Sequence, residues 1–114
     1  MSALTTHVLD TARGRPASRV PVRLSVRDDA GGLIIIGHGE TDEDGRLKNL
    51  VQPGTDLARG IYCLTFDVAA YFAAQRVESF YEEVTIVFKV QDATQHYHVP
   101  LLLSPFGYST YRGS

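Results

Sequence analysis

The end of the chain concentrates the side chains with the greatest capacity for chemistry. Residues 96–114 contain two histidines, three tyrosines and one arginine. Imidazoles take up and release protons near neutral pH, and a guanidinium can hold an oxyanion through its planar set of donors. Chain ends usually fray, yet this one finishes on Tyr111-Arg112-Gly113-Ser114 without a polar tail. We therefore expect an end that is held in place; a final edge strand with a disordered Gly113 and Ser114 is the alternative.

The spacing of His96 and His98 allows two interpretations. On a strand, His-x-His places both rings on one face, where they could supply two ligands to a zinc ion. No pair of acidic or thiol ligands lies close by in the sequence to complete such a shell. A structural or solvated role is the more common one for a strand histidine, so we predict no metal site.

The remaining candidates are two histidines and an arginine outside this segment. His7 lies in the middle of an expected strand, between Thr6 and Val8. His38 is flanked by two glycines, and we expect it in a turn without a functional role. Arg46 directly follows the acidic turn 42–45 and begins a strand. Its simplest role from composition is a salt bridge to that turn, which contributes little to stability.

The strand that carries His98 is expected to present two different faces. Alternate residues form an apolar face suited to the core, namely Tyr97, Val99, Leu101 and Leu103. The other face carries His96, His98, Pro100 and Leu102. A face that is partly apolar and partly ionisable suggests a protein interface that also holds a site.

The elements that must position these residues are mostly strands. Apolar residues alternate with a period of two over residues 20–27 and 84–90, and further strands are expected at 62–66 and 4–10, with a buried apolar run at 33–36. Turn-forming residues separate them. Asp67 can cap a short helix over residues 68–75. Seven or eight short strands predict an all-β sandwich with one helix.

Length and composition limit the possible classes of protein. With 114 residues, 44% of them hydrophobic and 21% charged, the chain is expected to form one globular domain over residues 1–114. A net charge of −2 gives no indication of binding to nucleic acid or an anionic membrane. No apolar stretch approaches twenty residues, and the first residues lack the pattern of a secretion signal, so a cytoplasmic location is the expectation. The single cysteine, Cys63, is expected to be a small buried side chain.

Four motifs resemble one family. They are Thr6–Ala17 (THVLDTARGRPA), Asp44–Leu47 (DGRL), His96–Pro105 (HYHVPLLLSP) and the terminal Tyr111–Ser114 (YRGS). In this order they are similar to the 5-hydroxyisourate hydrolases, the transthyretin-related enzymes of urate breakdown. The resemblance runs from residue 4 to the last residue. The terminal tetrapeptide is the motif that separates these enzymes from transthyretin, the thyroid-hormone carrier.

The resemblance implies a fold, an assembly and a set of site residues. The fold would be a transthyretin-like two-sheet sandwich of about eight strands with a short helix. The assembly would be a homotetramer, a dimer of dimers, with active sites at subunit interfaces in a central channel. The site residues carried over by position are His7, Arg46, His98, Tyr111, Arg112, Gly113 and Ser114. His96 is not carried over, no cofactor or metal is implied, and the location would be cytoplasmic, or peroxisomal in an animal source.

The implied reaction is hydrolysis of 5-hydroxyisourate to 2-oxo-4-hydroxy-4-carboxy-5-ureidoimidazoline. Water would attack a ring carbonyl, with His7 and His98 as the proton-handling pair; which of them is the base stays open. Arg46 would stabilise the oxyanion, Tyr111, Arg112 and Gly113 would contact substrate, and Ser114 with its carboxylate could orient a histidine. A serine nucleophile is less favoured. A carrier that binds a small aromatic ligand without chemistry and a purely structural module are the alternatives.

Overall fold

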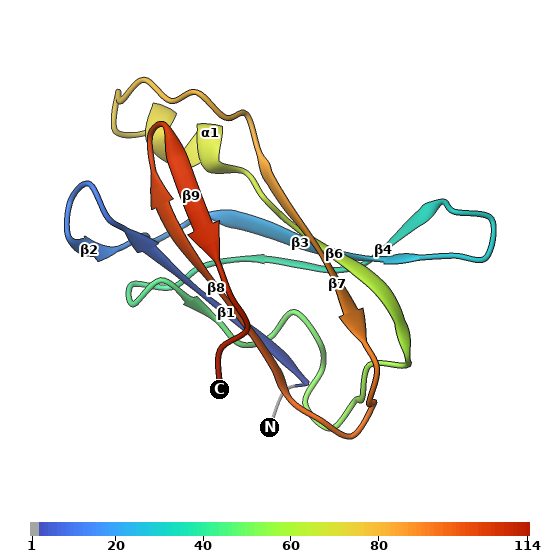
Figure 1. The fold of residues 1–114 in the computed structure, drawn as a ribbon. Coiled ribbons are helices and arrows are strands. Elements are labelled where there is room, and N and C mark those ends of the chain that lie inside the picture. Colours follow the sequence, from blue (N-terminus) through green and yellow to red (C-terminus); the bar gives the residue numbers. More distant parts are fainter. Residues whose placement is uncertain (1–2) are drawn as a thin grey trace.

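The computed structural model describes residues 3–114 as two β-sheets packed face to face, with one short helix (Figure 1). The first sheet joins β2 (Arg15–Pro16), β1 (Leu4–Asp10), β8 (Tyr97–Ser104) and β9 (Gly107–Thr110) in that order, and β5 (Arg46–Leu47) also pairs with β1. The second sheet joins β4 (Leu33–Glu40), β3 (Pro21–Arg27), β6 (Gly60–Phe66) and β7 (Val84–Val90). The predicted sandwich is confirmed.

Strands β1 and β8 come from opposite ends of the sequence and lie side by side (Figure 1). They pair in parallel from Leu4 opposite Tyr97 to Asp10 opposite Leu103, whereas the other paired strands in residues 3–114 are antiparallel. Because side chains alternate along a strand, this register places equivalent faces of the two strands together. The active-site candidates at both ends of the sequence therefore share one sheet.

The core lies between the two sheets and is made by alternate residues of the strands. Its fully buried side chains include Leu4, Val8, Leu24, Leu64, Phe66, Phe72, Leu101 and Leu103. The prediction for β8 is confirmed, because Tyr97, Val99, Leu101 and Leu103 are all buried. Thr6 is buried too, and its hydroxyl donates to the carbonyl of Val99 at 2.6 Å. Burial of this apolar face holds β1 and β8 in a single orientation.

The helix is shorter than the sequence suggested. Helix α1 spans Val68–Ala73, and the chain turns after Ala74 instead of continuing to Gln75. The predicted cap is confirmed, since the carboxylate of Asp67 accepts a hydrogen bond from the amide of Ala70 at 3.1 Å. Arg76, with a φ of 58°, follows in the left-handed region and ends the helical path.

The expectation of a buried run at residues 33–36 is wrong. The side chains of Leu33, Ile34, Ile35 and Ile36 are 45–61% exposed. Among the described residues, 3–114, β4 is an edge strand that pairs only with β3, and the hairpin that they form extends beyond the rest of the sandwich (Figure 1). An apolar run therefore reports strand tendency here but not burial.

His38 does not lie in a turn as expected. It is within β4, directly opposite Arg23 of β3. The glycines that flank His38 allow another segment of the chain to approach the strand closely. A Cβ on Gly37 would lie 2.2 Å from the carbonyl oxygen of Leu50, and one on Gly39 would lie 3.1 Å from a methyl group of Leu47. Glycine is needed at position 37 and leaves the closer fit at position 39, because the chain at 47–50 packs directly on the strand.

No helix within residues 3–114 has the length and apolar character needed to cross a membrane.

Candidate active site

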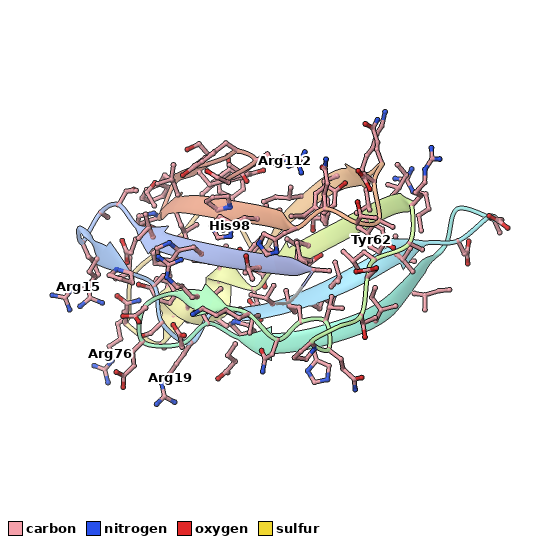
Figure 2. The ribbon with its side chains drawn as sticks, turned by 90° about the horizontal axis from the view of Figure 1, so that it is seen from below. Arg15, Arg19, Tyr62, Arg76, His98 and Arg112 are labelled. Atoms are coloured by element: carbon pink, nitrogen blue, oxygen red, sulfur yellow. The ribbon has the colours of Figure 1, made fainter. Side chains whose placement is uncertain are left out.

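Strand register brings His7, Arg46 and His98 to one face of the first sheet. His7 on β1 lies opposite Arg46 on β5 and, on its other side, opposite Pro100 on β8. Thr5, two residues before His7, lies opposite His98. These positions alternate with buried core residues on β1, so their side chains point away from the second sheet. Figure 2 shows His98 on β8, alongside β1.

The acidic turn that precedes Arg46 is built by Asp42. Its carboxylate accepts hydrogen bonds from the amides of Asp44 at 2.9 Å and Arg46 at 3.0 Å. The hydrogen bond from the Arg46 amide is the main reason that the pKa of Asp42 lies below its usual value. Gly45 completes the turn with a φ of 76°, and a Cβ there would lie 2.3 Å from the carbonyl oxygen of Val8. The turn can therefore dock on β1 only with glycine at this position.

The side chain of Arg46 interacts with the site as well as with the turn. Among the described residues, 3–114, Arg46 forms no ion pair with the acidic turn; its tie to Asp42 runs through the backbone amide. Its charge contributes to lowering the pKa of Asp42 and is also one of the causes that lower the pKa of His98. This arrangement replaces the salt bridge that composition alone suggested.

The turn also determines which nitrogen of His7 is available. The Nε2 of His7 lies 2.8 Å from the carbonyl oxygen of Asp44. A carbonyl can only accept, so Nε2 must carry the hydrogen. In the neutral ring the lone pair is therefore on Nδ1, which leaves that nitrogen as the one able to accept a proton.

His98 is half-buried and is held through its Nδ1, which lies 2.8 Å from the hydroxyl oxygen of Thr5. Its pKa lies below the ordinary value of 6.5. Burial is the largest cause, followed by the nearby charges of Arg46, His7 and His96, while a contact with the Thr5 backbone acts in the opposite direction. His98 is thus neutral at neutral pH and able to accept a proton.

The chain end is held against His98. The amide of Gly113 donates to the carbonyl of His98 at 2.8 Å, and the two residues form an isolated β-bridge. A Cβ on Gly113 would lie 2.5 Å from Cδ2 of His98 and 3.3 Å from Cγ of Pro100. This covering explains why Pro100, expected on the open face, is buried. The expectation that the end is held in place is confirmed at Gly113.

The other three residues of the tetrapeptide are exposed, and two of them line a small pocket. Arg112 donates to the side-chain oxygen of Gln95 at 2.9 Å, and its guanidinium lies 4.5 Å from the centre of the Tyr97 ring. Tyr111 is 59% exposed and Ser114 is also exposed. The pocket has a volume of about 190 Å³ and lies between β7, β8 and the chain end; its lining is Ile86, Phe88, Lys89, Tyr97, His98, Val99, Thr110, Tyr111 and Arg112.

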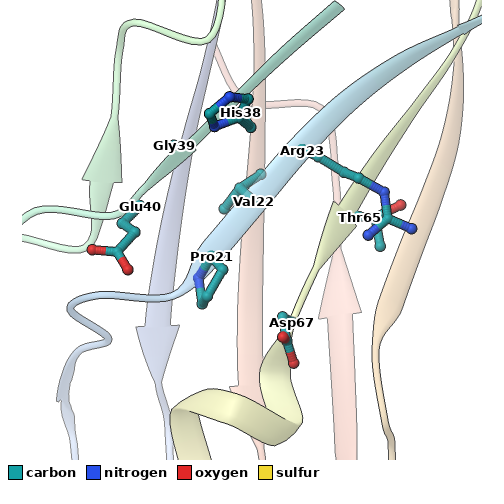
Figure 3. A pocket seen from close by; sticks show the side chains of 8 residues that line it. All are labelled: Pro21, Val22, Arg23, His38, Gly39, Glu40, Thr65 and Asp67. Carbon is teal, nitrogen blue, oxygen red and sulfur yellow. The ribbon is translucent and has the colours of Figure 1, made fainter. Parts of the chain in front are cut away.

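A larger pocket lies on the second sheet, away from these residues. Figure 3 shows its lining from β3, β4 and β6, which comprises Pro21, Val22, Arg23, His38, Gly39, Glu40, Thr65 and Asp67. Two of its charged groups have other partners, since Arg23 pairs with Glu83 at 3.8 Å and Asp67 caps α1. His38 is therefore a suitable control for the histidines of the first sheet.

Two contributors to the site were missed from the sequence, namely the hydroxyl of Thr5 and the carbonyl of Asp44. The Thr5-x-His7 spacing places Thr5 on the same face as His7, so alternation could have drawn attention to it. The carbonyl gives no sequence signal, because every residue has one. Within residues 3–114 no three His, Cys, Asp or Glu side chains form a group that could hold a metal ion.

Comparison with known proteins gives consistent matches over nearly the whole chain. Residues 4–113 match the model of the HIUase/Transthyretin family. The 5-hydroxyisourate hydrolase 2 of Rhizobium meliloti is 48% identical, with 97% of this chain and 95% of that protein covered. The structure of Klebsiella pneumoniae 5-hydroxyisourate hydrolase superposes with a TM-score of 0.86 at 37% identity, covering all of both chains. Sea bream transthyretin in complex with thyroxine gives a TM-score of 0.91 at 34% identity, covering 97% of this chain and 94% of that one.

Proposed function

Because the chain belongs to the HIUase/transthyretin family, we propose that it is a hydrolase that converts 5-hydroxyisourate to 2-oxo-4-hydroxy-4-carboxy-5-ureidoimidazoline. The reaction opens a cyclic amide by attack of water on a ring carbonyl. The observation that carries the proposal is the convergence of His7, Arg46 and His98 on one face of the first sheet. These are the residue types that water activation and oxyanion stabilisation require.

Proton transfer is assigned to the two histidines. His98 has a lowered pKa and is neutral at neutral pH, which suits a general base. His7 has its Nε2 occupied by the Asp44 carbonyl and keeps Nδ1 for proton transfer. One imidazole takes the proton from water as the water oxygen bonds to the ring carbonyl. As the carbon–nitrogen bond breaks, the leaving ring nitrogen takes up this proton, or one from the second imidazole in its protonated form. Which of the two is the base depends on how the substrate lies between them.

Arg46 is assigned to the developing negative charge. A guanidinium stays charged at all relevant pH values and presents its donors in one plane, as the oxygens of a planar heterocycle require. In the tetrahedral intermediate the attacked carbonyl becomes an oxyanion, and its attraction to Arg46 strengthens. Gly113 brings the chain end to His98. Tyr111, Arg112 and Ser114 then complete the wall of the substrate site.

We propose that the site is completed by a second subunit in a homotetramer built as a dimer of dimers. His7, Arg46 and His98 lie on the outer face of a sheet, where one chain supplies only one wall. Leu102 is half-buried on the same face. A charged residue there would be buried without a partner in a subunit contact. Leu102→Glu should therefore dissociate the assembly on a sizing column and abolish activity together, whereas fully active Leu102→Glu monomers would refute the shared site.

A ligand carrier is the weaker candidate. The superposition with sea bream transthyretin shows that the two chains share the sandwich fold, and a shared fold does not determine function. A carrier requires neither a pair of imidazoles for proton transfer nor the terminal tetrapeptide. The hydrolase from Rhizobium meliloti is also more similar in sequence, at 48% identity against 34% for the sea bream transthyretin.

The direct test is a spectroscopic assay of the reaction. Urate oxidase acting on urate generates 5-hydroxyisourate in place, and its ultraviolet absorption band then decays. The protein should accelerate this decay in proportion to its concentration. Decay at the spontaneous rate in the presence of folded protein would overturn the proposed function.

A further inference from the structure

Thr5 connects two imidazoles on the face of the first sheet that carries His7 and Arg46. Its hydroxyl oxygen lies 2.8 Å from Nδ1 of His98 and 3.1 Å from Nε2 of His96. Thr5 and His98 are directly opposite each other in the parallel pairing of β1 and β8. Side chains directly opposite in adjacent strands lie close to each other. Neither Thr5 nor His96 is among the residues assigned above to contact substrate.

The number of protons on the hydroxyl limits the possible arrangements. A threonine hydroxyl donates one hydrogen and accepts through its lone pairs. When it donates to Nε2 of His96, it must accept from Nδ1 of His98. When it accepts from both rings, Nδ1 of His98 again carries the hydrogen. Only donation to His98 places the lone pair on Nδ1, and His96 competes with His98 for that single hydrogen.

The backbone of Thr5 also contacts the ring of His98. Its contact with the ring raises the pKa and so opposes the other causes of the shift, because it favours a proton on the ring. When Nδ1 of His98 carries the hydrogen, Nε2 is the nitrogen that can accept a proton. Within residues 3–114, Nε2 of His98 makes no hydrogen bond, and its neighbour Cδ2 lies against Gly113.

We propose that Thr5 is a positioning residue, which holds His98 in the tautomer with hydrogen on Nδ1 and leaves the lone pair of Nε2 facing the substrate. His96 contributes by accepting the hydroxyl hydrogen of Thr5 and so orienting its lone pair toward His98. This inference rests on the proposed function for its catalytic consequence, while the tautomer itself is a property of the protein without substrate. Partners that orient a metal-binding histidine by its second nitrogen typically affect affinity or activity by about tenfold to a hundredfold, and we expect the same scale for His98.

The test compares two substitutions at Thr5 with a matched control at Thr6. Valine has nearly the same size as threonine. Thr5→Val removes the hydroxyl, and Thr5→Ser retains it. Thr6→Val removes the neighbouring hydroxyl, which donates to Val99 in the core. Nitrogen-15 NMR of the histidine rings without substrate distinguishes a nitrogen that carries hydrogen from one with a lone pair, and steady-state kinetics on 5-hydroxyisourate gives kcat and KM.

We expect wild-type protein and Thr5→Ser to show His98 with hydrogen on Nδ1, and Thr5→Val to show a mixture of tautomers. The kcat of Thr5→Val should fall about tenfold to a hundredfold with little change in KM, since Thr5 does not touch substrate. Thr6→Val should lose stability and keep the tautomer of His98. A wild-type tautomer with hydrogen on Nε2, or an unchanged tautomer or kcat in Thr5→Val, would overturn the inference. Absence of hydrolysis by wild-type protein would instead overturn the proposed function, and the NMR result would still decide the tautomer.

Discussion

Gly113 and His98 lie so close together that the chain end can pass the imidazole only without a side chain. A Cβ on Gly113 would lie 2.5 Å from Cδ2 of His98, which is closer than real Cβ contacts occur. The amide of Gly113 also bonds to the carbonyl of His98. Glycine is therefore required at position 113 for steric reasons. The contact couples the position of the chain end to the position of the His98 ring, which is proposed to be catalytic.

The first prediction follows from this contact. Gly113→Ala should displace either the ring of His98 or the chain end, because the methyl group has no space. Activity should fall by about a hundredfold, the scale expected when a reacting group is displaced by about an ångström. The thermal midpoint should change little, since the residue is outside the core. Gly107→Ala is the control, because a Cβ on Gly107 would lie 3.7 Å from the hydroxyl oxygen of Ser104, which is an ordinary contact. Equal activity of Gly113→Ala and wild-type protein would show that the contact has no catalytic role.

A second prediction concerns extension of the chain beyond Ser114. A C-terminal tag adds residues directly after the segment in which Gly113 contacts His98, so hydrolysis should fall by about a hundredfold or more. An N-terminal tag is the matched control. The circular dichroism spectrum should be the same for both tagged proteins, because the last four residues bury little of the core. Equal turnover of the two proteins would remove the chain end from the site.

A third prediction concerns pH. The pKa of His98 lies below 6.5 because burial and the nearby positive charges disfavour the protonated ring. The neutral ring therefore persists to lower pH than an ordinary histidine, and kcat/KM should remain high at pH 7 and decline only below about 6.5. The contribution of His98 to folding stability changes with pH in the same direction. It is present above the pKa of the histidine in the unfolded state and is lost as the pH falls through the lower pKa of the folded state. An NMR titration of the His98 ring with a midpoint at or above 6.5 would contradict the assignment.

A fourth prediction concerns Arg46. Arg46→Lys keeps the charge and loses the planar set of donors, so kcat/KM should fall by about a hundredfold. Folding stability should change by less than about 1 kcal/mol, because the side chain is exposed and the turn is held by the backbone amide of residue 46. A chemical denaturation curve measures this directly. An unchanged rate would mean that Arg46 does not contact the reacting group.

The sequence predicted the local features of the fold well, because these depend on near neighbours. The alternation around His98 correctly identified the core face of β8, and Asp67 correctly marked the start of the helix. The resemblance added the tetrapeptide, whose contact with His98 could not be derived from periodicity.

The failures have a common physical cause, which is contact between segments distant in sequence. The glycines around His38 suggested a turn, whereas they allow the segment 47–50 to pack closely against β4. The run at 33–36 suggested burial, but its strand lies at a sheet edge. Thr5 gained its position only through the parallel register with β8, 93 residues away along the chain. Such pairings are set by the whole core and not by the local pattern.

The most direct test of the account compares histidines on the two sheets in the 5-hydroxyisourate assay. His98→Gln and His7→Gln each remove a proposed proton-transfer group, whereas His38→Gln changes a histidine on the second sheet. We predict that wild-type protein and His38→Gln accelerate the decay of 5-hydroxyisourate equally. His98→Gln and His7→Gln should each be slower by about a hundredfold or more, the usual scale for loss of a general acid or base. Equal rates for all four folded proteins, or no acceleration by any of them, would contradict the assignment of this face as the active site.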